Sequence, residues 1–283
     1  MANFHHLVRF ENEEGQIVLG DIVQDVFALE SLVGVEADVF HGSSPWDSKF
    51  RPTGRKERIH RLLPPLESVP VFACVGLNYR HHAEEVKMDI PPTPPLFYKP
   101  PDSLAAPDED INIHPTARFL DYEGELCVVI GRECKNLRED EDPLDYVLGY
   151  TAGNDISSRY WQAAAISSSQ AGYAKGFDQF APIGPVISST RVIQDPSSLT
   201  LTTHVNGEER QRTRTDDMIF DVSAIIRFIS TGRTIRPGTV IMTGTPSGVV
   251  AGMDDKVWLK DGDTVEVTIQ KIGRLRNKMV MKA

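Results

Sequence analysis

The sequence predicts an α+β fold that is rich in strands. Short apolar runs separated by glycine- and proline-containing turns recur along most of the chain, which is typical of strands. Only one segment has the apolar spacing of a long helix, and Asp221 can cap its first turn. The residues on the apolar face of this helix are Val222, Ile225, Ile226 and Ile229. Strands that outnumber helices in this way favour a mixed domain over a doubly wound α/β sheet. We therefore expect a small N-terminal subdomain, residues 1–65, and a β-rich main domain, residues 66–283.

The first 65 residues divide into two parts. Apolar stretches on either side of the polar run Glu11–Gly15 predict a β-hairpin over residues 4–27. Residues 28–65 are irregular and contain several prolines, so we expect a short helix followed by a connection to the main domain.

The main domain begins near Val69 with a buried strand. A short helix over Arg80–Val86 follows it and ends before a proline-rich segment. Residues 167–172 are small and polar, which predicts a flexible loop, and Gly207 marks a hairpin turn. The segments that have the pattern of strands or extended chain are residues 70–79, 94–101, 121–131, 145–157, 199–205, 239–246 and 263–273.

The composition disfavours several classes of function. A formal net charge of -10 over 283 residues argues against a basic nucleic-acid-binding surface. No apolar run reaches the roughly 20 residues that a membrane-spanning helix needs. The acidic N-terminal stretch has the pattern of neither a signal peptide nor a transit peptide. The three cysteines form no CxxC pair and suggest no disulfide framework, which fits a reducing compartment. Cys74 and Cys127 lie in apolar runs, so we expect them to be core residues. We expect a cytosolic protein with no nucleic-acid or membrane partner.

Three acidic residues could bind a metal ion. Glu123 and Glu125 stand two apart on a predicted strand, so their side chains point to the same face. Because neighbouring carboxylates repel each other, a divalent cation would be a suitable counter-charge, although a solvated strand end fits the spacing equally well. Asp155 ends another apolar strand and could add a third carboxylate or cap a helix. A site of oxygen ligands alone would favour Mg²⁺, Mn²⁺ or Ca²⁺ over zinc.

A histidine and a glutamate could form a general base. His82 and Glu85 are three residues apart on the short predicted helix, so they are neighbours on its surface. A carboxylate beside an imidazole orients the ring and raises its basicity, but a charged surface helix would show the same spacing. Arg159 and Gln162 have this spacing too and could face a common anion. Lys175 by itself has the pattern of a surface charge.

Two motifs that bind ions or nucleotides are incomplete. Asp108, Asp110 and Asn112 resemble the start of an EF-hand loop, but Ile113 stands where that loop requires glycine. Residues 243–248, TGTPSG, lack the lysine of a phosphate-binding loop, and the sequence contains no GxGxxG motif. Neither an EF-hand nor a nucleotide site is therefore expected.

Taken together and in this order, the segments resemble the fumarylacetoacetate hydrolase family. The resemblance covers about residues 70–280 in register, whereas residues 1–65 match only loosely. It rests on the stretches VGLNYRHHAEE, PPLFYKPPDSL, DYEGELCVVIG, YTAGNDISSRYWQ, AKGFDQFAPIGP, VNGE, MIF and PGTVIMTGTPSGV.

The resemblance implies a fold, a metal and a set of site residues. The fold would be a β-rich roll of mixed sheets, usually in a homodimer, and the metal would usually be Mg²⁺. The metal ligands would be Glu123, Glu125 and Asp155. The catalytic dyad would be His82 and Glu85, on a lid that orders over the substrate. The other residues of the site would be Lys175 near the developing negative charge, Arg159 and Gln162 in contact with the substrate, and Thr245 near the substrate carboxylate.

These implications describe an enzyme that acts on a small oxo-acid. A 2-oxo or 1,3-dicarbonyl acid would react through an enolate stabilised by the metal. The reaction would be C–C bond hydrolysis of the acylpyruvate type, or decarboxylation or tautomerisation of oxaloacetate. Residues 163–172, which border the site in relatives, are rich in Ser and Ala and leave the substrate preference open, and the small residues 163–165 would leave room for a larger, polyketide-like dicarbonyl. A non-catalytic metal- or ligand-binding protein on the same fold would lack a metal-binding residue or the base. All three predicted metal ligands and both residues of the predicted dyad are present.

Overall fold

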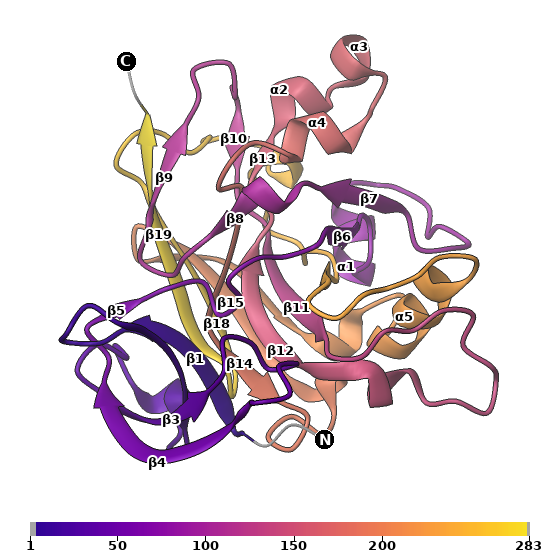
Figure 1. Cartoon of the computed structure of the whole chain (residues 1–283). Coiled ribbons are helices and arrows are strands. Elements are labelled where there is room, and N and C mark those ends of the chain that lie inside the picture. Colours follow the sequence, from indigo (N-terminus) through magenta and orange to yellow (C-terminus); the bar gives the residue numbers. More distant parts are fainter. Residues whose placement is uncertain (1–3, 282–283) are drawn as a thin grey trace.

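The computed structural model describes residues 4–281, and strands dominate it (Figure 1). The strands are β1 (His6–Glu11), β2 (Ile17–Ile22), β3 (Glu36–His41), β4 (Arg51–Arg58), β5 (Arg61–Leu62), β6 (Phe72–Val75), β7 (Leu96–Lys99), β8 (Leu104–Ala105), β9 (Asp110–Ile113), β10 (Leu120–Asp121), β11 (Gly124–Ile130), β12 (Val147–Asn154), β13 (Ser157–Ser158), β14 (Ala181–Ser189), β15 (Thr200–Val205), β16 (Glu208–Arg214), β17 (Val240–Met242), β18 (Thr264–Ile269) and β19 (Gly273–Met281). The helices are α1 (Arg80–Glu85), α2 (Arg159–Gln162), α3 (Ala164–Ser167), α4 (Ala171–Lys175) and α5 (Val222–Ser230).

Two sheets form the frame of the molecule. The larger sheet has 12 strands, and its main path follows the order β4-β3-β2-β1-β14-β12-β11-β17-β6-β7, with β5 on β1 and β8 on β14. The smaller sheet has five strands in the order β16-β15-β18-β19-β9, and β10 pairs with β13. Antiparallel pairs predominate, but β6 runs parallel to β17 and β9 parallel to β19. The predicted β-rich α+β class, with mixed sheets, is confirmed.

The N-terminal strands extend the larger sheet. β1 and β2 form the predicted hairpin, and β1 also pairs with β14. The short helix predicted within residues 28–65 is wrong, because this fully described range contains β3, β4 and β5. Ala37 and Val39 alternate into the core as strand residues do, but β4 is mostly exposed and is held by backbone pairing with β3, so no apolar pattern marks it. The division into residues 1–65 and 66–283 stays a prediction.

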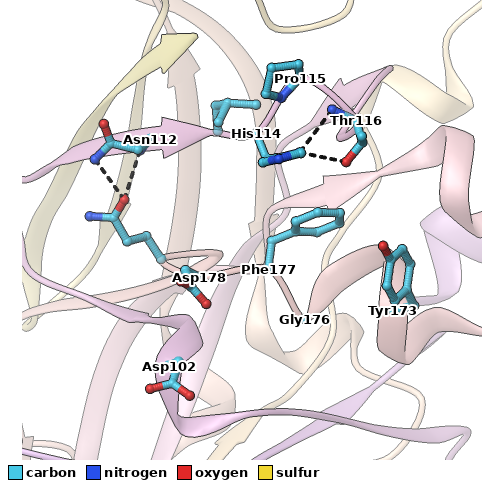
Figure 2. A pocket seen from close by; sticks show the side chains of 11 residues that line it. Asp102, Asn112, His114, Pro115, Thr116, Tyr173, Gly176, Phe177 and Asp178 are labelled. Carbon is cyan, nitrogen blue, oxygen red and sulfur yellow. Dashed lines mark hydrogen bonds between the residues drawn. The ribbon is translucent and has the colours of Figure 1, made fainter. Parts of the chain in front are cut away.

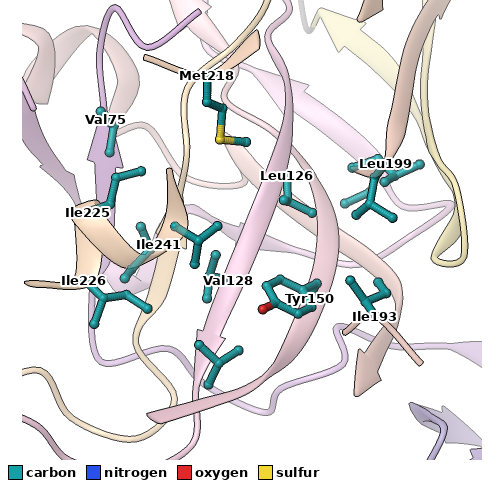
Figure 3. Close-up of a cluster of buried hydrophobic side chains, with 14 of the residues drawn as sticks. Val75, Leu126, Val128, Tyr150, Ile193, Leu199, Met218, Ile225, Ile226 and Ile241 are labelled. Carbon is teal, nitrogen blue, oxygen red and sulfur yellow. The ribbon is translucent and has the colours of Figure 1, made fainter. Parts of the chain in front are cut away.

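The main core lies between the two sheets and α5 (Figure 3). Strand β11 is buried on both faces: Leu126 and Val128 enter this core, while Cys127 and Val129 join a second apolar cluster on the opposite face. Cys74 also lies in the second cluster, so both cysteines predicted to be core residues are buried. None of the helices within residues 4–281 is long and apolar enough to cross a membrane.

The predicted long helix is α5. Asp221 caps it by accepting a hydrogen bond from the backbone N–H of Ala224 at 2.7 Å. Its predicted apolar face packs against the main core through Val222, Ile225, Ile226 and Ile229. A helix of nine residues is marginal in water, so this packing holds α5 in place.

The other predicted elements differ mainly in their bounds. α1 matches the short helix predicted over Arg80–Val86, and β15 and β16 form the hairpin predicted around Gly207. The loop predicted over residues 167–172 is shorter, since only residues 168–170 separate α3 from α4. The strand predicted over residues 121–131 is interrupted, because Asp121 pairs with β13 whereas β11 pairs with β12.

Candidate metal centre and active site

Strand pairing gathers the segments that carry the site. β11 and β12 are antiparallel with Gly124 opposite Asn154, so Glu123, just before β11, lies beside Asp155, just after β12. The backbone N–H of Asp155 donates to the carbonyl of Glu123 at 2.9 Å. β17 pairs with β11 on its other side and β6 runs parallel to β17, so the segments that follow β6 and β17 emerge at the same end of the sheet. These segments carry α1 and the loop of residues 243–248.

Three carboxylates form a buried cluster. Glu123, Glu125 and Asp155 each offer an oxygen, and these oxygens lie within 4.8 Å of one another. Lys175 Nζ donates to Glu123 Oε2 at 2.6 Å and to Asp155 Oδ2 at 2.7 Å. Lys99 Nζ donates to Asp155 Oδ1 at 2.6 Å. Two ammonium groups therefore balance part of the negative charge of this carboxylate triad.

The two glutamates of the triad have different electrostatic surroundings. Burial acts to raise the pKa of Glu123, but Lys175 and Arg159 outweigh it and lower this pKa to about 2. Burial raises the pKa of Glu125 well above its usual range, and the neighbouring Asp155 and Glu123 raise it further. Glu123 has counter-charges within the chain, whereas the surroundings of Glu125 disfavour its ionised form.

The two carboxylate oxygens of Glu125 differ in their surroundings. Oε2 accepts a hydrogen bond from the backbone N–H of Gly244 at 2.7 Å, but Oε1 is buried and meets no donor among the described residues. A buried carboxylate oxygen without a partner is costly, and a cation bound there would satisfy it. A donor set made of carboxylate oxygens suits Mg²⁺, Mn²⁺ or Ca²⁺. The residues of the triad therefore fit a divalent cation.

Arg159 connects the triad to two further polar side chains. It forms an ion pair from Nη2 to Glu123 Oε1 at 2.6 Å and donates from Nε to Asp121 Oδ2 at 2.8 Å. Its Nη1 donates to Gln162 Oε1 at 2.7 Å. Burial acts to lower the pKa of Arg159, but Glu123 and Asp121 outweigh it and raise this pKa. The structure thus places Arg159 and Gln162 in contact with each other, beside a predicted metal ligand.

His82 and Glu85 form a hydrogen-bonded pair on α1. His82 Nδ1 lies 2.9 Å from Glu85 Oε2, and Glu85 Oε1 accepts from the backbone N–H of Gly248 at 2.9 Å. Gly248 has a φ of +99°, and a Cβ there would collide with the carbonyl of Arg210, so only glycine fits this turn. The helix that carries the predicted base is therefore anchored to the loop of residues 243–248.

The loop of residues 243–248 contacts both groups of the site. One end donates to Glu125 and the other end donates to Glu85. Between them, Thr245 is buried and donates from Oγ1 to the carbonyl of Gly124 at 3.1 Å. Within residues 4–281 no hydrogen bond or ion pair joins the dyad directly to the triad. The shared loop therefore sets the position of one relative to the other.

Two buried charged residues of the site were missed from the sequence. Lys99 is 1% exposed, and besides Asp155 it contacts the carbonyl of Phe180. Asp121 is fully buried two residues before Glu123. A charged residue inside an apolar, extended segment needs a partner once that segment is buried, so the surroundings of Lys99 did contain a signal. Asp121 lies in the DYEGE motif, and nothing in that motif distinguishes it from an exposed aspartate beside the two glutamates.

A pocket of about 910 Å³ lies beside α4 and contains none of the predicted site residues (Figure 2). Phe177 and Tyr173 form apolar parts of its wall, and His114 Nδ1 lies 2.8 Å from Thr116 Oγ1 on another side. Lys175, the last residue of α4, contacts the carboxylate triad and does not line this pocket. The candidate chemistry is therefore centred on the buried cluster and not on this pocket.

Comparison with known proteins decides the family. The family model described as "Fumarylacetoacetate (FAA) hydrolase C-terminal" matches residues 71–280. The chain belongs to the fumarylacetoacetate hydrolase family. An uncharacterized protein of Archaeoglobus fulgidus is 46% identical over 220 residues, which are 78% of this chain and 82% of that protein. The oxaloacetate tautomerase YisK of Bacillus subtilis is 40% identical over 226 residues, which are 78% of this chain and 73% of that protein.

The likeness to a solved structure extends beyond the residues that the family model matches. The solved structure of 2-hydroxyhepta-2,4-diene-1,7-dioate isomerase from Mycobacterium marinum is similar with a TM-score of 0.82 and 35% sequence identity, and the match covers 99% of both chains. The resemblance inferred from the motifs is confirmed. Because these relatives include a tautomerase and an isomerase, the chain belongs to a family of enzymes. The roles of the individual site residues stay predictions.

Residues 80–93 are expected to gain order when the site is filled. Of the six residues of α1 only Ala83 is buried, and Met88 and Ile90 after it are exposed. Such a short helix is marginal by itself, so its amide hydrogens should exchange more slowly with Mg²⁺ and oxalate bound. Hydrogen exchange followed by mass spectrometry checks this, with α5 as an internal control that should not change. Equal exchange in residues 80–93 with and without oxalate would contradict the prediction that these residues form a lid over the substrate.

Proposed function

We propose that the chain catalyses keto–enol exchange of oxaloacetate or a closely related 2-oxo acid, with a divalent cation held by Glu123, Glu125 and Asp155. The observation that carries the proposal is one oxygen of Glu125 that has no partner within residues 4–281, in a buried triad that shares a loop with a histidine–glutamate pair. The similarity to the oxaloacetate tautomerase YisK supports the choice of substrate. Decarboxylation of oxaloacetate and hydrolysis of an acylpyruvate also pass through an enolate, so the experiment must separate them.

The carboxylate triad would hold the cation. A divalent cation, when bound, supplies a Lewis acid that polarises the 2-oxo group of the substrate. Lys99 and Lys175 orient Asp155 by binding different oxygens of its carboxylate. Such contacts around a ligand commonly matter for metal affinity, because they hold the ligand in one orientation.

His82 is the proposed base. With Nδ1 turned to Glu85, its Nε2 is left to take a proton from C3 of the keto acid, and Glu85 stabilises the resulting imidazolium. The enolate oxygen then takes a proton from water and the imidazolium releases one to water, which completes the enol and restores the base. In the reverse direction the oxygen loses its proton and the same nitrogen returns a proton to C3. The backbone N–H of Gly248 fixes Glu85, and through it the orientation of the ring.

Lys175 and Arg159 are proposed to accommodate negative charge on the substrate. Burial acts to lower the pKa of Lys175, but Asp155 and Glu123 outweigh it and raise this pKa, so the ammonium stays charged. It can therefore donate a hydrogen bond to an oxygen that becomes negative. Arg159 makes three contacts within the chain, which leaves N–H groups for the second carboxylate of oxaloacetate.

Turnover of oxaloacetate with added Mg²⁺ tests the proposal. Ultraviolet absorbance follows the enol form, release of pyruvate reports decarboxylation, and a short acylpyruvate tests C–C bond hydrolysis. We expect keto–enol exchange that EDTA abolishes and that added Mg²⁺ restores. The expected product is the other tautomer, without loss of carbon dioxide.

Each other outcome corrects the proposal in a different way. Pyruvate formed in place of exchange would make the protein a decarboxylase, and cleavage of the acylpyruvate alone would make it a C–C bond hydrolase. No turnover of either substrate with Mg²⁺, Mn²⁺ or Ca²⁺ would overturn the assignment to small oxo-acids. A larger dicarbonyl substrate or a non-catalytic binding protein would then be the next candidates to test.

A further inference from the structure

Asp121 is a buried carboxylate that has no part in the proposed reaction. It ends β10 and has no exposed surface. Its Oδ1 accepts from the backbone N–H groups of Tyr122 at 3.0 Å and Val250 at 2.9 Å. Its Oδ2 accepts from the backbone N–H of Ala251 at 3.0 Å and from Arg159 Nε at 2.8 Å. Four donors, one of them cationic, therefore depend on this side chain.

One side of this network reaches the metal ligands. Arg159, which donates to Asp121, also forms an ion pair with Glu123 through Nη2. Because a guanidinium is planar, two carboxylates that bind different nitrogens fix its orientation. Asp121 therefore holds Arg159 where it can neutralise Glu123 and present its remaining N–H groups to the substrate.

The other side of the network reaches the catalytic dyad. Val250 and Ala251, which donate to Asp121, belong to the turn Val250–Gly252. The last residue of this turn lies against Glu85, since a Cβ built on Gly252 would lie 2.5 Å from Glu85 Cδ. A shift of the turn would therefore displace Glu85, and with it the ring of His82.

We propose that Asp121 is a positioning residue that sets Arg159 on one side and Glu85 on the other, and so couples substrate binding to proton transfer. The kinetic consequences rest on the proposed function, whereas the structural coupling does not. Asparagine at this position would keep the shape but offer one acceptor oxygen in place of two. In either orientation of the amide, two of the four buried donors would lose their acceptor.

Asp121→Asn is compared with Asp263→Asn. Asp263 is also buried, and it accepts from the backbone N–H of Lys260 and from Asn206 Nδ2, both at 2.9 Å, and neither donor is one of the site residues. Both variants are expected to unfold at a lower temperature. Only Asp121→Asn is expected to lower kcat/KM for oxaloacetate, by about 10–100-fold, with kcat lowered and KM raised.

Hydrogen exchange in the metal-free protein separates this inference from the proposed function. Asp121→Asn should speed amide exchange both in residues 248–253 and in α1, whereas Asp263→Asn should leave both segments unchanged. If the wild type does not act on oxaloacetate, the proposed function fails, and these exchange rates still test Asp121. Unchanged exchange in α1, or a lower melting temperature with unchanged kcat and KM in an active enzyme, would overturn the inference.

Gly252→Ala tests the contact between the turn Val250–Gly252 and Glu85 while Asp121 is left unchanged. This variant replaces Asp121→Asn as the test if Asp121→Asn does not fold. The added methyl group would press on the carboxylate of Glu85. We expect faster amide exchange in α1 and a lower kcat, with KM nearly unchanged because Arg159 stays in place. If α1 exchanges at the wild-type rate, the turn does not position Glu85 and the proposed coupling is wrong.

Discussion

Glu125→Gln is expected to abolish oxaloacetate turnover while the protein stays folded. Glutamine keeps an oxygen for the backbone N–H of Gly244 but removes the negative charge that the cation would bind. A Lewis-acidic cation contributes several kcal/mol to the transition state, so we expect a loss of about 10³-fold or more in kcat/KM. Titration calorimetry should show weaker Mg²⁺ binding. Because burial and the neighbouring Asp155 and Glu123 disfavour the ionised form of Glu125 and so raise its pKa, a neutral amide should leave the metal-free variant melting at the wild-type temperature or above it.

Two further variants and a control complete this test. Glu208→Gln is the control, because Glu208 is exposed on β16 and pairs with Arg210. Glu123→Ala and Asp155→Ala should also abolish activity, but they should destabilise the protein, since each leaves the buried ammonium of Lys175 short of a partner. Wild-type activity and Mg²⁺ content in all three variants would disprove the metal centre.

His82→Ala is expected to lower kcat by roughly 10²–10⁴-fold, which is the range for a positioned general base. Mg²⁺ affinity should stay nearly the same, because His82 bonds Glu85 and not the carboxylate triad. Glu85→Gln should have a similar effect, since Glu85 orients the ring. The losses should not add in the double variant, because the two residues act as a unit. Steady-state kinetics and calorimetry measure both quantities.

The neighbouring histidine provides the matched control. His81 lies on the same helix, is exposed, and pairs with Asp217 at 2.8 Å. His81→Ala should therefore leave kcat unchanged. An equal loss of kcat in His81→Ala would argue against His82 as the specific base. Losses that add in the double variant of His82 and Glu85 would show two independent roles.

The elements that depend on local pattern were determined by the sequence itself. A capping aspartate followed by apolar residues at helical spacing defines α5, and an uninterrupted apolar run, Leu126–Ile130, defines a strand that must be buried on both faces. The candidate chemistry was visible for the same reason. Glu123 and Glu125, and likewise His82 and Glu85, stand close together in the chain, so simple geometry places each pair together.

The tertiary structure alone decided how these pairs meet. Lys99 and Asp155 are 56 positions apart, and three strands stand between β7 and β12 in the larger sheet. They meet because the chain after β7 returns to this region, where β8 pairs with β14. No sequence pattern predicts β4, because it is an exposed edge strand held by backbone hydrogen bonds, which do not depend on the pattern of side chains. The role of Asp121 could not be predicted, because its four donors come from three separate parts of the chain. The buried partner of a charge is chosen by strand register and loop position, and those are properties of the folded chain.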